Sequence, residues 1–366
     1  MQKVRIRSLI GYFCRCDSHK GLILLFYFLQ LGYITMLWKT ITPKNASSDY
    51  NRCPELFFMY CQKTVSRLFS FSRIILIFSL IGGLSFSLLA QNDTTEIHKI
   101  RLRLKWFHKF QFAGYYAAKE KGFYLDENLD VRITERDPRE ETVDSLMNGT
   151  SEYAISDTNI ILDYQKGGRI KILAAILQHS PLILISLRKS GITTPHDLLG
   201  KKVMYGQDDK ASIIAMMLEE GVSPLSFSYV RHSYNIQDLI NGNIDAMTAY
   251  ITNEPYEFKK KGIPINIINP LNYGIDIYGD LLITTEEEIL KNPENTKKFI
   301  RASLKGWDYA LRHRDEIIQL IIDKYNPGLD KIHLEYEAEE IKRFIIPDLI
   351  ELGHINPKRF ERISEI

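Results

Sequence analysis

Cysteine is the residue that most of this chain lacks. All four cysteines, at positions 14, 16, 53 and 61, fall within the first 90 of 366 residues, and residues 97–366 contain none. This distribution excludes a disulfide framework, a cysteine-based zinc site and a thiol nucleophile from the larger part of the chain. A cysteine-free domain also suits an oxidising compartment.

An excess of charge of one sign is lacking as well. The chain has 47 Lys and Arg against 45 Asp and Glu, a formal net charge of +2, and the basic residues are spread along it. A surface that follows a phosphate backbone is therefore not expected, and nucleic acid is excluded as a partner.

Catalytic and metal-binding patterns are missing too. His232, His313, His333 and His354 are scattered without metal-ligand spacing, and no serine lies in a nucleophile elbow. Since no group of residues suggests a catalytic centre, we predict no catalytic residues and no metal site. Binding without chemistry is the simplest interpretation.

Long hydrophobic stretches occur only near the N-terminus. Gly21–Trp38 is uncharged and close to the roughly 20 residues that a membrane helix needs. Ile74–Ala90 follows basic residues and ends in small ones, as a secretory signal does. We expect translation to start at Met59, so that residues 1–58 are a doubtful extension and residues 59–90 a signal peptide cleaved near Gln91, in preference to a membrane anchor.

The start at Met1 remains open. In that case two membrane helices would tether the domain to the inner membrane, with the basic stretch between them on the cytoplasmic side. Both versions place residues 97–366 outside the cytoplasm, in the periplasm.

Strands and helices alternate from residue 100 onward, which indicates an α/β fold. This alternation of strands and helices runs through the chain in two series, which suggests two lobes with a ligand cleft between them. One lobe comprises about 97–185 plus 280–366, and the other about 186–279. We expect strands at 100–104, 130–134, 153–155, 170–176, 181–187, 201–206, 227–230, 246–250 and 265–268, and helices at about 112–122, 140–148, 159–165, 255–260, 295–313, 315–325 and 333–345.

Aromatic residues crowd the run 105–124, where the first strand turns into a helix with several alanines. Ligands bind at the carboxyl ends of strands in open α/β sheets, so Trp106, Phe107 and Phe112 could supply flat apolar walls there. Phe110, Tyr116 and Phe123 suit a core equally well. Trp307 has apolar neighbours at helical spacing and is expected in the core.

The order of several motifs resembles one family of periplasmic substrate-binding proteins, which also contains the fungal thiamine-pyrimidine synthases and the alkanesulfonate binders. The likeness covers about 100–360. The matching segments are Leu104–Trp106, Gln111–Tyr124, Leu129–Val131, Ile192–Val203, Gly242–Ala246 and Thr252–Pro255. The resemblance implies a two-lobed type II periplasmic-binding-protein fold with an interlobe ligand cleft.

The resemblance leaves three functions open. We favour an exported solute-binding protein of an ABC importer, which captures a small heterocycle, expected to be a thiamine pyrimidine (hydroxymethylpyrimidine) precursor, and passes it to a permease in the inner membrane. The first alternative is a synthase that makes hydroxymethylpyrimidine phosphate from pyridoxal phosphate and histidine. The second is the periplasmic sensory domain of a truncated signalling protein, with the rest encoded beyond Ile366.

Three departures from the synthase pattern argue against that first alternative. Ser156 and Ile160 stand where the resemblance puts a Schiff-base lysine and a consumed histidine. No cysteine lies near 278–282, where the fungal enzymes carry an iron-binding motif, and Asp208 and Asp209 would repel a phosphate in the matching loop. No cofactor is therefore expected; pyridoxal phosphate and iron belong only to the synthase alternative.

The candidate ligand-binding residues follow strand ends or lie on the two crossings. Trp106 is expected to stack on a flat ring and Glu254 to act as the opposing polar anchor. Asp157 could equally cap a helix, and Glu254 could equally be a first-turn residue favoured by the helix dipole. The full set is Trp106, Gln111, Phe112, Asp157, Thr158, Ser180, Gly206, Gln207, Tyr250, Asn253, Glu254, Tyr278 and Asp280.

Overall fold

The computed structural model describes residues 96–137, 139–165 and 167–365. The described residues all belong to one compact unit, Thr94–Ile366. The predicted extension at 1–58 and the predicted signal peptide or anchor at 59–90 lie outside them. Within the described ranges, no helix is both long and apolar enough to cross a membrane.

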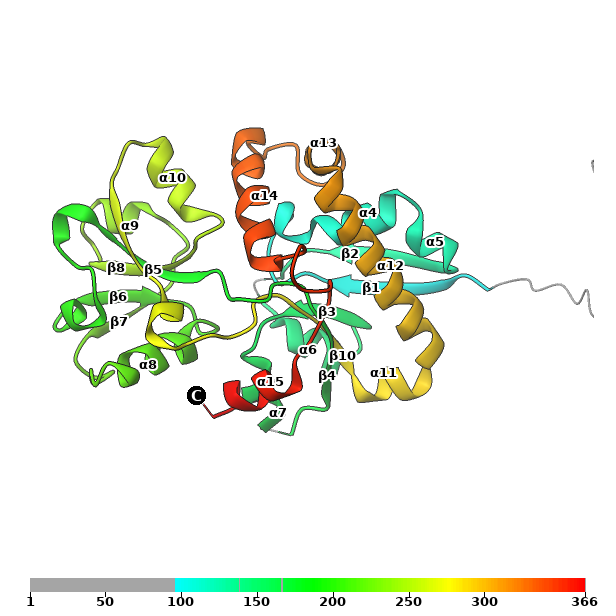
Figure 1. The fold of residues 1–366 in the computed structure, drawn as a ribbon, viewed down its shortest axis with the longest axis horizontal. Helices are drawn as coiled ribbons and strands as arrows, with labels where there is room; N and C mark the ends of the chain where they lie inside the picture. Colours follow the sequence, from blue (N-terminus) through cyan, green and yellow to red (C-terminus); the bar gives the residue numbers. More distant parts are fainter. Residues whose placement is uncertain (1–95, 138, 166, 366) are drawn as a thin grey trace, which may run out of the picture. The chain divides into compact units, whose positions relative to one another are not determined.

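The first sheet has five strands in the order β2-β1-β3-β10-β4 (Figure 1). β1 pairs in parallel with β2 and β3, whereas β10 is antiparallel to β3 and β4. Alternating burial along β2 shows why this segment is a strand, since Leu129, Val131 and Ile133 face the core and the residues between them do not. The strands are β1 (His98–Arg103), β2 (Leu129–Thr134), β3 (Tyr153–Ser156), β4 (Ile170–Ala175) and β10 (Leu281–Thr285).

The second sheet repeats this plan in the order β7-β6-β8-β5-β9. β6 pairs in parallel with β7 and β8, and β5 is antiparallel to β8 and β9. All six residues of β5 are buried, which fits its uninterrupted apolar sequence between two neighbours. The strands are β5 (Leu182–Leu187), β6 (Lys202–Tyr205), β7 (Ser228–Arg231), β8 (Ala246–Tyr250) and β9 (Ile265–Ile268).

Helices cover both faces of each sheet, and each face has its own apolar cluster. The helices α4, α12, α13 and α14 gather beside the first sheet (Figure 1). The helices are α4 (Ala113–Glu120), α5 (Phe123–Asp126), α6 (Thr142–Met147), α7 (Ile160–Gln165), α8 (Lys210–Glu219), α9 (Gln237–Ile240), α10 (Glu254–Lys260), α11 (Glu286–Lys291), α12 (Pro293–Arg312), α13 (Arg314–Lys324), α14 (Lys331–Ile345) and α15 (Pro357–Ile363). Short 3₁₀ turns lie at Phe110–Phe112, Arg188–Ser190, Pro195–Leu198 and Pro270–Tyr273.

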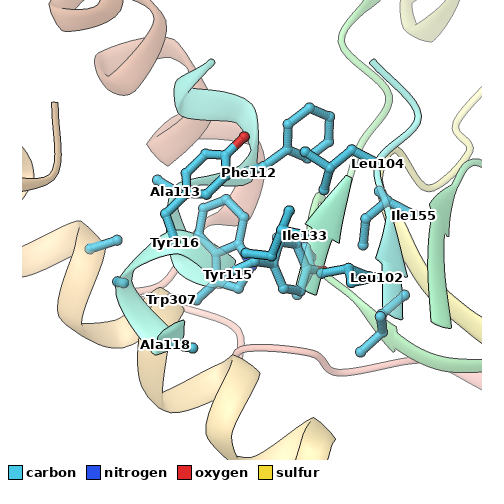
Figure 2. Packing of buried hydrophobic residues seen from close by; sticks show 14 of the residues in the cluster. Leu102, Leu104, Phe112, Ala113, Tyr115, Tyr116, Ala118, Ile133, Ile155 and Trp307 are labelled. Atoms are coloured by element: carbon cyan, nitrogen blue, oxygen red, sulfur yellow. The ribbon is translucent and has the colours of Figure 1, made fainter. Parts of the chain in front are cut away.

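The closest helix packing joins α4 to α12. A Cβ atom on Gly306 would overlap the carbonyl oxygen of Gly114 and lie 2.7 Å from the Cβ of Ala118, so only glycine fits there. Trp307 is fully buried and meets Tyr115 edge to face at 5.9 Å, as Figure 2 shows. The predicted core position of Trp307 is confirmed.

Two crossing segments, 176–181 and 269–280, connect the sheets and bond to each other. The Ser180 N–H donates to the Ile277 carbonyl at 2.9 Å, and the Gly279 N–H donates to the Leu177 carbonyl at 3.0 Å. A Cβ atom on Gly279 would lie 2.7 Å from that of Leu177, so the segments approach too closely for any other residue. The pair forms a compact hinge.

Most predicted elements are confirmed within a few residues, and the differences concern the crossings and the C-terminal part. No strand is predicted at 281–285, yet β10 lies inside the first sheet, between β3 and β4. The expected lobe boundary at 185 falls inside β5. That strand belongs wholly to the second sheet, so the boundary lies before Leu182. The short helices α11 and α15 were not predicted either.

The contact of α4 with α12 predicts that Gly306→Ala destabilises the protein. The added methyl group must push backbone atoms apart, and overpacking of this kind costs about 1–3 kcal/mol of unfolding free energy. Chemical denaturation followed by circular dichroism measures the loss. Gly328→Ala is the matched control, because its Cβ would meet only Asn326 at 3.4 Å; an equal loss in both variants would contradict this account of the packing.

Candidate functional site

One cavity of the described unit lies where three parallel strands of each sheet end. Residues after β1, β2 and β3 form one wall, and residues after β6, β7 and β8 form the other, as expected for the carboxyl edges of α/β sheets. We call this space the inner cavity; its volume is about 710 Å³, counting the part open to solvent. Its lining is Lys105, Trp106, Lys109, Gln111, Arg136, Asp157, Leu182, Gly206, Asp208, Asp209, His232, Tyr234, Thr248, Ala249, Tyr250, Thr252, Asn253 and Glu254.

Lys105 is the hub of the polar contacts in the inner cavity. Its Nζ lies 2.9 Å from Oδ2 of Asp157 and 3.5 Å from Oδ1 of Asp280, and it donates to the hydroxyl of Tyr250 at 3.0 Å. The side chain is only 13% exposed. Although burial alone would lower its pKa, the attraction of Asp157, Tyr250 and Asp280 raises the pKa of Lys105 well above the usual value, so the amine is protonated.

A buried carboxyl group lies beneath this lysine. Asp280 is 2% exposed and accepts two hydrogen bonds from Nε2 of Gln111, at 2.8 and 3.0 Å. Burial raises the pKa of Asp280, and the nearby Lys105 offsets part of that rise. Asp280 is the last residue of the second crossing, directly before β10. The crossing therefore brings this carboxyl group to the site.

The segment that carries Lys109 and Gln111 is held by a carboxyl group of another helix. Glu337 of α14 is 2% exposed and accepts from the Phe110 N–H at 2.9 Å, at the start of the 3₁₀ turn before α4. Burial raises the pKa of Glu337 to about 7. Lys109 reaches the other wall of the cavity, where its Nζ donates to Oδ1 of Asn253 at 3.0 Å.

The start of α8 brings two carboxyl groups to the opposite wall. Oδ2 of Asp209 accepts from the Thr248 hydroxyl at 2.7 Å and from the Gly206 N–H at 3.2 Å. Partial desolvation in the cavity and repulsion from Asp157 and Glu141 raise the pKa of Asp208 to about 6, although its side chain is still exposed to solvent. Within the described part of the chain, neither Asp208 nor Asp209 forms an ion pair, so both can accept from a ligand.

Trp106 and Tyr234 close one side of the inner cavity. Their ring centroids are 4.8 Å apart, and the guanidinium group of Arg136 lies 5.1 Å from the Trp106 ring. Trp106 and Arg136 follow strands of the first sheet, whereas Tyr234 follows β7 of the second. This contact therefore joins the two lobes.

Seven of the thirteen predicted ligand-binding residues line the inner cavity: Trp106, Gln111, Asp157, Gly206, Tyr250, Asn253 and Glu254. Their role in ligand binding stays a prediction. Glu254 already accepts from its own loop through both oxygens, from the Tyr250 N–H at 2.8 Å and from Asn253 Nδ2 at 2.6 Å. Asp157 likewise accepts from the Asn159 N–H at 3.0 Å while it pairs with Lys105.

The other six predicted residues lie elsewhere. Gln207 lines a neighbouring cavity, and Asp280 supports Lys105 and Gln111 from below. Phe112 is fully buried in the core beside α4. Ser180 and Tyr278 belong to the hinge, and Thr158 bonds to it. The Thr158 hydroxyl donates to the Tyr278 carbonyl at 2.8 Å, the Tyr278 ring stacks on Phe360, and the Ser180 hydroxyl accepts from the Leu182 N–H at 3.3 Å.

Sequence reasoning did not select Lys105, Lys109, Arg136, His232, Tyr234 or Thr248 as binding residues. A strand-end rule would have found half of them, because Lys105 lies two residues after β1, Arg136 two after β2 and His232 one after β7. Thr248 lies inside β8 and carries no such signal. No group of three or more His, Cys, Asp or Glu that could hold a metal ion occurs in residues 96–137, 139–165 and 167–365.

Known proteins share both the sequence pattern and the fold. Residues 109–317 match the model of the "NMT1/THI5 like" family, which is more than half of the chain. The riboflavin-binding protein RibY of Chloroflexus aurantiacus is 24% identical over 63% of this chain and 68% of its own length. The formylaminopyrimidine-binding protein of Halalkalibacterium halodurans is 24% identical over 74% of this chain and 84% of its own.

One further relative carries an enzyme name. The 4-amino-5-hydroxymethyl-2-methylpyrimidine phosphate synthase of Legionella pneumophila is 24% identical over 61% of this chain and 72% of its own length. Relatives of this family therefore include both binding proteins and synthases.

Solved structures agree on the architecture. The alkanesulfonate-binding protein SsuA of Xanthomonas axonopodis has a TM-score of 0.55 at 12% identity, over 67% of this chain and 84% of its own. The periplasmic aliphatic sulphonate-binding protein SsuA of Escherichia coli has a TM-score of 0.53 at 12% identity, over 74% of this chain and 99% of its own. The predicted fold is confirmed, and the chain belongs to the NMT1/THI5-like family with a periplasmic-binding-protein fold.

Proposed function

We propose that this protein is an exported solute-binding protein of an ABC importer. It captures a small nitrogen heterocycle, most simply a thiamine pyrimidine precursor, in the periplasm and passes it to a permease in the inner membrane. The observation that carries the proposal is the inner cavity, which lies between the carboxyl edges of two sheets joined by a two-segment hinge.

The chemistry of the inner cavity favours an aminopyrimidine. Trp106 offers a flat face for a ring, and Asp208 and Asp209 offer carboxylate oxygens for amino groups. Lys109 offers a donor for a ring nitrogen or a hydroxyl group on the other side. The formylaminopyrimidine-binding relative from Halalkalibacterium halodurans supports this class of ligand.

The synthase remains the second candidate, since the Legionella pneumophila relative carries that name. A synthase of this kind needs an uncharged lysine to form a Schiff base. Lys105 and Lys109 are the lysines on the wall of the inner cavity, and the ion pairs of Lys105 with Asp157 and Asp280 keep its amine protonated. This arrangement favours binding, and pyridoxal phosphate and iron enter only under the synthase alternative.

Calorimetric titration tests the proposed function directly. We expect 4-amino-5-hydroxymethyl-2-methylpyrimidine to bind with a dissociation constant below about 100 μM, an affinity of roughly −5.5 kcal/mol. Trp106→Ala should weaken binding at least about tenfold because the stacking face is lost. Leu225→Ala, at a residue 94% exposed and outside the inner cavity, is the control.

Absence of binding by the folded protein would reject the aminopyrimidine. A yellow preparation with bound pyridoxal phosphate would instead support the synthase.

Asp208→Asn tests whether this carboxylate contributes to ligand binding. At pH 7.5 the wild-type side chain is ionised, and a charge-assisted hydrogen bond is worth roughly 1 kcal/mol more than a neutral one, or about fivefold in affinity. As the pH falls through about 6, Asp208 takes up a proton and the difference from the variant should shrink. Titrations at pH 5 and pH 7.5 measure the ratio of wild-type to variant affinity.

Glu219→Gln, at the exposed C-terminal end of α8, is the charge-matched control. An affinity ratio that does not change with pH would contradict the role assigned to Asp208.

The same variant has a predicted effect on stability in the absence of ligand. Because the folded pKa of Asp208 is raised, the folded state binds its proton more tightly than the unfolded state, and stability falls as the pH rises from about 4 to about 6. Asp208→Asn should therefore raise the melting temperature slightly at pH 7.5 relative to wild type, and not at pH 4; the effect is small because the side chain is exposed and solvent screens its charge. Thermal unfolding at both pH values checks the sign.

A further inference from the structure

A second cavity lies directly beside the inner cavity. This outer cavity has a volume of about 790 Å³, counting the part open to solvent. The two cavities share six lining residues, so they are separated by one layer of side chains: Trp106, Arg136, Gly206, Asp208, His232 and Tyr234. The remaining lining of the outer cavity is Phe107, Glu141, Gln207, Tyr229 and Arg231.

The layer between the cavities is built from two halves, one on each lobe. In the first lobe the Arg136 N–H donates to the Trp106 carbonyl at 3.1 Å, and the guanidinium group lies over the Trp106 ring. In the second lobe the rings of His232 and Tyr234 stack at 4.5 Å. We call these four residues the partition.

Few contacts hold the two halves together. Trp106 and Tyr234 touch at 4.8 Å between ring centroids, and Arg136 Nη1 donates a long bond of 3.3 Å to the Tyr234 hydroxyl. An aromatic pair of this kind is worth only about 0.5–1.5 kcal/mol beyond its buried area. Tyr234 is 53% exposed, so its side chain can turn outward without opening the core.

The backbone of Tyr234 indicates that its position is imposed. Its φ is 58°, in the left-handed region that a bulky side chain rarely adopts. The ring nitrogen Nδ1 of His232 accepts from the Tyr234 N–H at 2.8 Å and fixes this conformation. The loop is thus strained at Tyr234, and this strained conformation places the tyrosine ring opposite Trp106.

The outer cavity suits a second flat ring. Aromatic side chains form much of its wall, and Phe107 and Tyr229 are 41% and 44% exposed beside the partition. A ligand ring in the inner cavity that carried a second ring toward Tyr234 would have to displace that side chain.

We propose that Tyr234 is the residue that limits the ligand to a single ring, and that the outer cavity is the space a second ring takes when the partition opens. The inference rests on the proposed function, because it concerns the same ligand. It makes Tyr234 a specificity-determining residue, acting by exclusion of longer ligands.

The test compares two probes that share one aminopyrimidine ring. One is 4-amino-5-hydroxymethyl-2-methylpyrimidine, and the other is thiamine, in which the ring carries a second ring. Wild type should bind the single-ring probe at least tenfold more tightly in calorimetric titrations. Tyr234→Ala should bind thiamine at least tenfold more tightly than wild type does, and the ratio of its affinity for thiamine to that for the single ring should rise by at least the same factor.

Two further variants separate the ring from the hydroxyl group of Tyr234. Tyr234→Phe keeps the ring and should keep the wild-type preference. Arg136→Met keeps Tyr234 itself but removes the guanidinium group from both the Trp106 and Tyr234 rings, and it should improve thiamine binding in the same direction as Tyr234→Ala. Tyr164→Ala, at an exposed residue of α7, is the matched control and should match wild type. Melting temperatures confirm that each variant is folded.

The outcomes distinguish this inference from the proposed function. If wild type binds both probes equally, or if Tyr234→Ala and Arg136→Met leave their affinity ratio unchanged, the partition does not set ligand length, while aminopyrimidine binding stands. If neither probe binds any folded variant, both proposals are wrong.

Discussion

Close approach of the two crossing segments is the constraint on which the rest of the structure depends. Gly279 lies so close to Leu177 that no larger residue fits at this position, and backbone hydrogen bonds join the two segments. Each crossing leads straight into an antiparallel strand, β5 or β10, that lies inside a sheet of otherwise parallel neighbours. The two sheets therefore repeat one plan, and the carboxyl ends of their parallel strands form opposite walls of one cavity.

The hinge also determines the chemistry of that cavity. Asp280 is the last residue of the second crossing, and its buried carboxyl group contacts Lys105 and Gln111 of the first lobe. Lys105 in turn contacts Tyr250 of the second lobe. A single chain of contacts thus leads from the segments that connect the lobes to the wall that a ligand meets.

The fold and the position of the cleft could be predicted from the sequence, because alternation of strands with helices and the strand-end rule are local signals. Trp106, Asp157 and Tyr250 lie on the cavity wall for that reason. β10 was missed because Leu281–Thr285 follows a crossing rich in turn residues and pairs only with strands more than a hundred residues away.

Individual side chains were harder to predict, since neighbours distant in sequence decide which way they point. Thr158 follows a strand end and Tyr278 lies on the second crossing, yet the Thr158 hydroxyl donates to the Tyr278 carbonyl at the hinge. Glu254 was predicted as a ligand anchor, but its two oxygens accept from its own loop. Tyr234 gave no signal, because its place opposite Trp106 depends on a left-handed backbone.

The distribution of charge around Lys105 has a consequence for the motion of the lobes. Both carboxylates that balance its ammonium group, Asp157 and Asp280, belong to the same lobe as the lysine, and the other lobe contributes only the neutral hydroxyl of Tyr250. Parting the lobes at this point breaks no ion pair of Lys105. Two other pairs join α10 to α14 and the segment before it, Lys260 with Asp330 and His333 with Glu257, and both are partly exposed. Among the described residues, the ion pairs that opening breaks are therefore ones that salt can screen.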